Sequence, residues 1–212
     1  YPHNYIKKLD LVLRFLPRPA DYLFLYLIGF YILLLVLKIE YRIAAFGALA
    51  FGFSTYLIII LGVGHNAKAH AIAYMPLVLS GVILTFQKRY FIGFSLTAIA
   101  SGLELVTNHP QMSYYLFILI LILGISYLVQ AIKSNQLPAF FKASAVLFVA
   151  AFSALGMNAT NLLATSSYTK ESTRSKSELT INLDGSIREQ SSGLDKAYIT
   201  QFSYGILESF NL

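Results

Sequence analysis

The stretch Gly62–Ala71 carries two histidines and one lysine at the point where one long apolar run ends and another begins. Its ionisable residues are His65, Lys68 and His70. Because an ionisable side chain costs roughly 2.5–3.5 kcal/mol inside a bilayer, three of them at one membrane boundary need a physical reason. We interpret them as the substrate-binding part of a polar site at a membrane surface. A short loop that simply reaches water is the alternative.

A second polar stretch, Glu104–Ser113, follows a thin apolar segment. A carboxylate at the end of such a segment can be buried and can then act as an acid or a base, so we assign Glu104 and His109 as catalytic groups. The alternatives are a helix-end carboxylate that pairs with Lys68 or with a histidine, and a histidine in a solvated turn. Tyr114 comes next in the chain and could stack on a sugar ring or a prenyl chain.

A third polar stretch begins after Met157 and includes Lys170. Together with Lys68, Lys170 could hold an anionic head group such as the pyrophosphate of a lipid carrier, although simple solvation of both lysines is the alternative. His65 and His70 are five positions apart, so on one helix they point about 140° from each other, which is a poor spacing for a shared metal. The sequence therefore does not identify a cofactor, and among metal ions a divalent cation held by carboxylates is favoured over zinc.

The composition is that of a polytopic membrane protein. The chain has 212 residues, of which 57% are hydrophobic and 12% are charged, whereas a soluble domain carries about 25% charged residues. It has no cysteine, which excludes disulfides and thiolate metal sites. In this setting the formal net charge of +6 indicates membrane topology and contact with lipid headgroups, and no nucleic-acid partner.

The hydropathy pattern predicts an all-α membrane bundle of about six transmembrane helices over residues 22–157. Before it, residues 1–21 form an amphipathic segment that we expect to lie in the membrane interface, with Lys7, Lys8, Asp10 and Arg14 on its polar face. After it, residues 158–212 read as the start of an incomplete extracytoplasmic α/β domain. The apolar segments are Tyr22–Leu37, Ile43–Leu61, Ile72–Phe86, Phe91–Leu103, Tyr114–Gln130 and Phe141–Met157.

The connections between these segments alternate in charge. One set is tight and basic, and the other holds a single basic residue between spans, Lys68. The positive-inside rule places the basic set in the cytoplasm and both chain ends outside the cell. The three polar stretches then share the outer face of the membrane. The basic set comprises Lys38, Arg42, Lys88, Arg89, Lys133 and Lys142, with Glu40 as its acidic residue.

Several stretches resemble the YfhO family of bacterial membrane proteins, and the resemblance covers nearly the whole chain. The most specific is Gly64-His-Asn-Ala-Lys-Ala-His-Ala; the others include Ala50-Phe-Gly-Phe-Ser-Thr-Tyr and Gln111-Met-Ser-Tyr-Tyr. The match is to the interior of the family pattern, so we expect the chain to be an internal piece of a longer protein or a processed one.

The resemblance implies a GT-C class glycosyltransferase in the bacterial cytoplasmic (inner) membrane. Such an enzyme takes a sugar from a polyprenyl-phosphate donor and transfers it to a cell-envelope glycopolymer on the outer face. In that class a carboxylate of the first outer loop acts as the base, and most of that loop would precede Tyr1. A non-catalytic scaffold with membrane-protein partners, or a transporter or flippase of lipid-linked sugars, remains the alternative.

Overall fold

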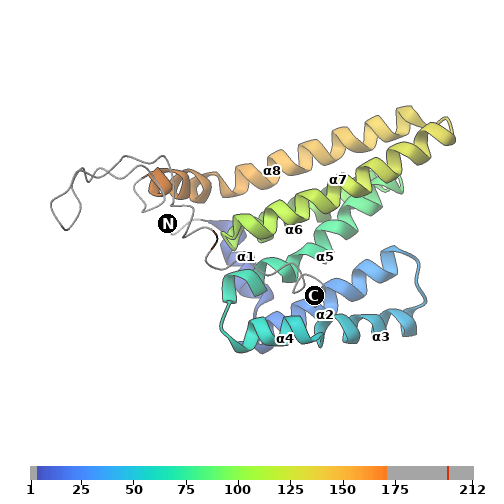
Figure 1. Ribbon diagram of the computed structural model, residues 1–212. Helices are drawn as coiled ribbons and strands as arrows, with labels where there is room; N and C mark the ends of the chain where they lie inside the picture. Colours follow the sequence, from blue (N-terminus) through green and yellow to red (C-terminus); the bar gives the residue numbers. More distant parts are fainter. Residues whose placement is uncertain (1–3, 171–199, 201–212) are drawn as a thin grey trace. The chain divides into compact units, whose positions relative to one another are not determined.

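The computed structural model describes residues 4–170 and residue 200, and within them it is helical and has no strand (Figure 1). The chain divides into two compact units, Tyr1–Asn161 and Leu162–Leu212. Most of the expected α/β domain, residues 171–199 and 201–212, lies outside the described residues. The helices are α1 (Tyr5–Leu13), α2 (Ala20–Val36), α3 (Tyr41–Gly52), α4 (Thr55–Gly62), α5 (Asn66–Phe86), α6 (Tyr90–Val106), α7 (Pro110–Lys133) and α8 (Leu137–Lys170).

Each of the six predicted apolar segments is helical, and three helices are long and apolar enough to cross a membrane. These are α5, α7 and α8. The second segment is broken instead of continuous: α3 and α4 meet at a bend of 43°, and together they would make a fourth span. The helices α2 and α6 are apolar but have only 17 residues each. Six spans therefore remain a prediction.

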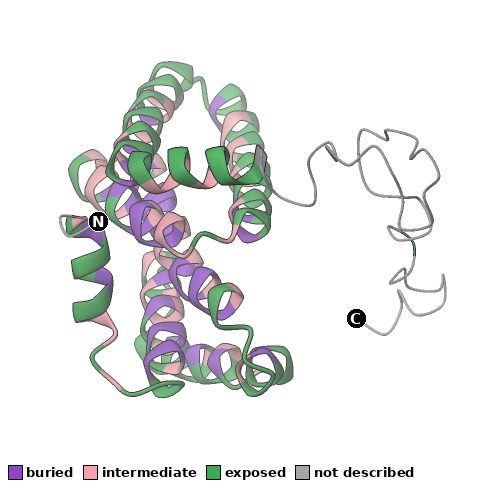
Figure 2. Ribbon diagram, turned by 90° about the vertical axis from the view of Figure 1, so that its left-hand side faces the viewer, coloured by how far each residue is buried: buried purple, intermediate pink, exposed green. Residues whose placement is uncertain are grey.

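The helix α5 lies at the centre of the first unit and packs mainly against α6 and α2. It is 72% buried over its apolar window, whereas the windows of α7 and α8 are 11% and 17% buried. Buried residues occupy the faces where helices meet, and exposed residues cover the outward faces (Figure 2). An apolar, exposed face of this length is what a helix in contact with lipid requires.

A reciprocal contact of glycine with threonine holds α5 against α6. A Cβ atom added at Gly81 would lie 2.6 Å from the backbone nitrogen of Thr97, and one added at Gly93 would lie 2.7 Å from that of Thr85. Each glycine is four residues from the threonine on its own helix, so the same small-residue spacing runs along both antiparallel helices. Glycines in such positions let two backbones approach closely. We call these four residues the glycine–threonine seam.

The turns of the first unit gather at two ends of α5, about 30 Å apart at 1.5 Å per residue. At the C-terminal end, Gln87 Nε2 donates to the Val36 carbonyl at 3.0 Å, and Lys88 Nζ donates to Gln136 Oε1 at 2.9 Å. These bonds join the turns after α2, α5 and α7. At the N-terminal end, His70 contacts α1 through Asp10. The basic connections thus share one end of the bundle, as the alternation of charge in the sequence predicts.

The predicted polar face of the N-terminal helix is corrected by the structure. Lys7 and Lys8 are exposed, but Asp10 is buried and Arg14 turns inward beside it. The outward face of α1 instead carries apolar residues, among them Val12 at 69% exposure. The reason is that Asp10 finds cationic and hydroxyl partners inside the bundle, which offset its loss of water.

Two boundaries also differ from the sequence-based expectation. The helix α5 begins at Asn66, so Lys68 and His70 lie on a helix and only the residues before them form a turn. The helix α8 continues to Lys170, whereas the apolar segment was expected to end at Met157. Residues 158–170 continue α8 because they contain neither glycine nor proline, whereas the first polar stretch is interrupted at Gly64, which has a left-handed φ of +76°.

Candidate functional site

A buried ionic cluster joins α1, α2 and α5 at the N-terminal end of α5. Asp10 Oδ1 lies 2.6 Å from His70 Nε2 and accepts a hydrogen bond from the Tyr74 hydroxyl at 2.8 Å. Asp10 Oδ2 accepts from Arg14 Nη2 at 2.8 Å, and Arg14 Nη1 reaches Asp21 Oδ2 at 3.3 Å. We call these five residues the Asp10 cluster. It links three helices whose members are up to 64 positions apart.

Local sequence features position the members of this cluster. The side chain of Asn4 caps α1 by accepting from the Lys7 amide at 3.2 Å, which fixes where the helix begins. Asp10 and Arg14 are four residues apart, so they lie on one face of the helical turn. In α5, His70 and Tyr74 have the same spacing, and both point toward Asp10. Two helix faces therefore meet with complementary charge and hydrogen-bonding groups.

Asp10 is held as a stable anion. Burial by itself would raise its pKa, but the hydrogen bonds from His70 and Arg14, the positive charge of His70, and the Tyr74 hydroxyl together lower the pKa to about 2. A catalytic base works best with a pKa near the working pH. Asp10 is therefore suited to orienting His70 and Arg14, and it is a poor proton acceptor.

Glu104 has a different environment. Its side chain is 2% exposed, and both of its oxygens accept from the Ser113 hydroxyl, at 2.9 and 3.0 Å. Ser113 lies one helical turn after His109, and its backbone N–H donates to the His109 carbonyl at 3.3 Å. The Nδ1 atom of His109 is buried and has no hydrogen-bond partner among the described residues. We call Glu104, His109 and Ser113 the Glu104 cluster; Ser113 bonds to the carboxylate of Glu104 and to the backbone carbonyl of His109, so the described bonds do not join the two predicted catalytic side chains.

The remaining predicted site residues have different surroundings. His65 is exposed and precedes α5 as its N-cap residue. Lys68 is half-buried, and its Nζ lies 5.1 Å from the centre of the Tyr56 ring. Tyr114 is 60% exposed on α7. Lys170 is the last residue of α8, and its side chain lies outside the described part of the structure.

The two clusters lie at the same end of the first unit but make separate contacts. Leu103, next to Glu104, packs in one apolar cluster with Ile6 and Tyr74, beside the Asp10 cluster. His70 is bonded to Asp10, and Glu104 to Ser113. A single cavity shared by the histidines and Glu104 thus stays a prediction. Within residues 4–170, no three His, Asp or Glu side chains are grouped closely enough to hold a metal ion.

Sequence reasoning placed Asp10 and Arg14 on the polar face of the interfacial segment, and it gave neither Asp21 nor Tyr74 a role in the site. The available signal was the pairing of two four-residue spacings, Asp10 with Arg14 and His70 with Tyr74. Each spacing is common on its own. Only the contact between α1 and α5 makes them complementary, and that contact is not local in the chain.

Comparison with known proteins identifies no relative: no protein-family model, curated protein or solved structure matches the chain. The resemblance to the YfhO family therefore stays a prediction.

Proposed function

We propose that the chain is part of a GT-C class integral-membrane glycosyltransferase, related to the YfhO family, that uses a polyprenyl-phosphate sugar donor. The observation that supports this most is the environment of Glu104, which is buried and has the neutral hydroxyl of Ser113 as its described partner. A buried carboxylate next to a cation stays an anion, whereas one next to a hydroxyl takes up and releases a proton more readily. Glu104 therefore has the chemistry that a catalytic base needs.

In the proposed reaction an acceptor hydroxyl attacks the anomeric carbon of the donor sugar. The bond from that carbon to the phosphate oxygen breaks, and the polyprenyl phosphate leaves with the bonding electron pair. Glu104 takes the proton of the attacking hydroxyl, and His109, next to Ser113, passes it to solvent. Lys68 and His65 bind the leaving phosphate, because a hydrogen bond from a charged donor to a phosphate is stronger than one between neutral groups.

The membrane setting is part of the same proposal. All six apolar segments cross the bacterial cytoplasmic membrane, with the end that carries Glu104 and His70 facing outward and both chain ends outside the cell. Residues 158–212 contribute the start of an outer α/β domain, and the acceptor is a cell-envelope glycopolymer. Basic turns at the other end of α5 support this orientation, because cytoplasmic loops are enriched in lysine and arginine.

One observation favours a second function, a non-catalytic membrane scaffold. In the Asp10 cluster every carboxylate oxygen of Asp10 is bonded to a donor, and Arg14 bridges two acids. Such a saturated network fixes helices in place and needs no substrate to explain it. The two functions differ in what they require of Glu104, since a scaffold has no use for its proton.

The test is a Glu104→Gln variant of the full-length protein in bacterial membranes supplied with radiolabelled polyprenyl-phosphate hexose or N-acetylhexosamine. Glutamine keeps the shape and the Ser113 contact but cannot accept a proton, so transfer of label into polymer should fall about 100-fold or more. The matched control is Glu40→Gln, an exposed carboxylate at the other end of the bundle. Circular dichroism should show the same helix content in both variants.

Wild-type transfer by a folded Glu104→Gln variant would exclude Glu104 as the base. If wild-type membranes also transferred neither sugar, the scaffold function would be favoured over the enzyme.

A further inference from the structure

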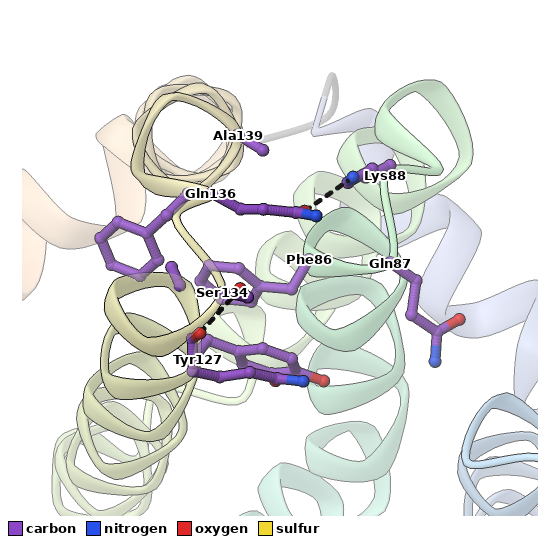
Figure 3. Close-up of a pocket in the computed structure, with 10 residues that line it drawn as sticks. Phe86, Gln87, Lys88, Tyr127, Ser134, Gln136 and Ala139 are labelled. Carbon is purple, nitrogen blue, oxygen red and sulfur yellow. Dashed lines mark hydrogen bonds between the residues drawn. The ribbon is translucent and has the colours of Figure 1, made fainter.

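A cavity of about 350 Å³ lies between the turn after α5 and the turn that joins α7 to α8 (Figure 3). It is at the opposite end of α5 from the two clusters described above, so it is separate from the proposed glycosyl-transfer site. Aromatic rings form one part of its wall, and polar side chains form the other part. The lining includes the aromatic residues Phe86, Tyr127 and Phe140 and the polar residues Lys88, Gln130 and Gln136.

Stacked rings hold the helices around the cavity together. The ring of Phe86 lies 4.4 Å from that of Tyr127 at an angle of 13°, and 5.6 Å from that of Phe140 at 20°. These three residues come from α5, α7 and α8. Because offset-stacked aromatic pairs are favourable contacts, the wall is a packed surface and the cavity has a defined shape.

Lys88 is one of the residues that line the cavity. Its backbone adopts a left-handed conformation, with φ +67°, and its Nζ donates to Gln136 Oε1 at 2.9 Å (Figure 3). This conformation ends α5, because the backbone amides of Lys88 and Arg89 bond back to the Thr85 and Leu84 carbonyls at 3.0 Å each. An ammonium group has three N–H donors, and Gln136 accepts one of them. None of the described residues that line the cavity is acidic.

The cavity also lies at the expected depth of lipid headgroups. The membrane-span candidates α5 and α7 end beside it, at Phe86 and Lys133, and the candidate α8 begins there at Leu137. A second cavity, of about 540 Å³, lies near the same turn and is lined by Lys38 and Arg89. The acidic residue at this end, Glu40, caps α3 by accepting from two backbone amides. This end of the bundle is therefore electropositive.

We propose that the cavity between α5, α7 and α8 binds the phosphate group of an anionic phospholipid. The Lys88 ammonium group pairs with the phosphate oxygens, and the side-chain amides of Gln130 and Gln136 donate hydrogen bonds to them. The apolar faces of α7 and α8 provide the surface for the acyl chains. Basic pockets between membrane helices are suited to this class of ligand because charge attraction and membrane depth act together.

The test uses the full-length protein in phosphatidylcholine nanodiscs and measures the binding of a fluorescent phosphatidylglycerol. Lys88→Gln should weaken binding more than about tenfold, because it removes a charge-assisted hydrogen bond to the phosphate as well as the surface attraction of one basic residue. The matched control is Lys133→Gln, because Lys133 is an exposed lysine at the same end that does not line the cavity. The Lys133→Gln variant should lose at most about fivefold in affinity, which is the diffuse surface attraction of one basic residue.

A second variant separates the cavity from the charge. Ala139→Leu places a larger side chain in the cavity wall and leaves every charge unchanged, so it should also reduce binding. Equal losses for Lys88→Gln and Lys133→Gln, with none for Ala139→Leu, would show diffuse attraction to the surface and overturn the proposal. Displacement of the lipid by millimolar inorganic phosphate would identify free phosphate as the ligand and would also overturn it.

Discussion

At the scale of single residues, two buried carboxylates have opposite surroundings. Asp10 contacts an arginine, a histidine and a tyrosine, whereas the described partner of Glu104 is one serine hydroxyl. Cationic partners stabilise the charged form of a carboxylate, and burial without them destabilises it. The two acids therefore suit two roles: Asp10 fixes the position of its neighbours, and Glu104 is the acid that we propose exchanges a proton.

The low pKa of Asp10 makes the stability of the first unit depend on pH. Because the folded-state pKa, about 2, is below the usual value of 3.8, the stabilisation is complete above about pH 4 and is lost as the pH falls toward 2. After allowance for solvent screening, the loss is about 1–2 kcal/mol. Thermal unfolding followed by circular dichroism in detergent should show it as a falling midpoint over this range.

An Asp10→Asn variant provides the comparison for this pH dependence. It should be less stable than the wild type at pH 7, because Arg14 and His70 lose their shared anion, and its midpoint should change less between pH 4 and pH 2. Lys7→Gln removes an exposed charge from the same helix and should retain the wild-type dependence. An identical slope in Asp10→Asn would show that another group titrates.

At the scale of elements, the glycine–threonine seam sets the distance between α5 and α6. Gly81→Ala should destabilise the folded protein by about 1–3 kcal/mol, as overpacking of a close contact does. The new methyl group would meet the backbone of Thr97 at 2.6 Å, so no side-chain rotation removes the clash. The measurement is the midpoint of thermal unfolding in detergent.

The control for the seam is Gly124→Ala on α7, where an added Cβ atom meets nothing within 4 Å. Alanine has the higher helix propensity, so this variant should be as stable as the wild type or slightly more stable. Equal destabilisation of both variants would mean that glycine matters at these positions for a reason other than helix contact.

The helical elements were largely predictable, because apolar runs of this length leave few alternatives to a membrane helix. The break between α3 and α4 was not predictable. The run Ile43–Leu61 contains neither proline nor a charged residue. The bend follows Phe53, which ends α3 and whose backbone N–H donates to the Leu49 carbonyl. A polar residue inside the run, Ser54, is the weak local signal.

The orientation of α1 could not be predicted for a different reason. Its charges were assigned to the polar face of a helix in the membrane interface, because an isolated amphipathic pattern favours that choice, and Lys7 and Lys8 are indeed exposed. Asp10 is buried because His70 and Tyr74, which are 60 and 64 positions later in the chain, form hydrogen bonds with its carboxylate. In the site itself, Glu104, His109 and His70 were identified as chemically unusual, but the partner of each depends on contacts between helices.

At the scale of the whole chain, charge distinguishes the two ends of the first unit. One end gathers the basic turns and the lysine-lined cavity, and the other holds the Asp10 and Glu104 clusters. This asymmetry is the basis of the proposed orientation in the membrane. It also means that the proposed lipid site and the proposed reaction site lie on opposite membrane surfaces.

Cysteine labelling tests this orientation, because the chain has no native cysteine. Lys88→Cys and Lys133→Cys should react with an impermeant maleimide only after the cells are opened, whereas Lys68→Cys and Lys170→Cys should react in intact cells. Labelling of Lys88→Cys from outside would reverse the topology, and with it the surface on which the reaction is proposed to occur.

The glycine–threonine seam has a consequence for genetic suppression. In most packed interfaces a larger residue on one side can be accommodated by a smaller one opposite. Here the atoms that an alanine at position 81 or 93 would meet include backbone nitrogens of the facing helix, which no substitution removes. Revertants of such variants should therefore be true reversions or changes elsewhere in the bundle, and the two glycine positions should have no compensating partner across the seam.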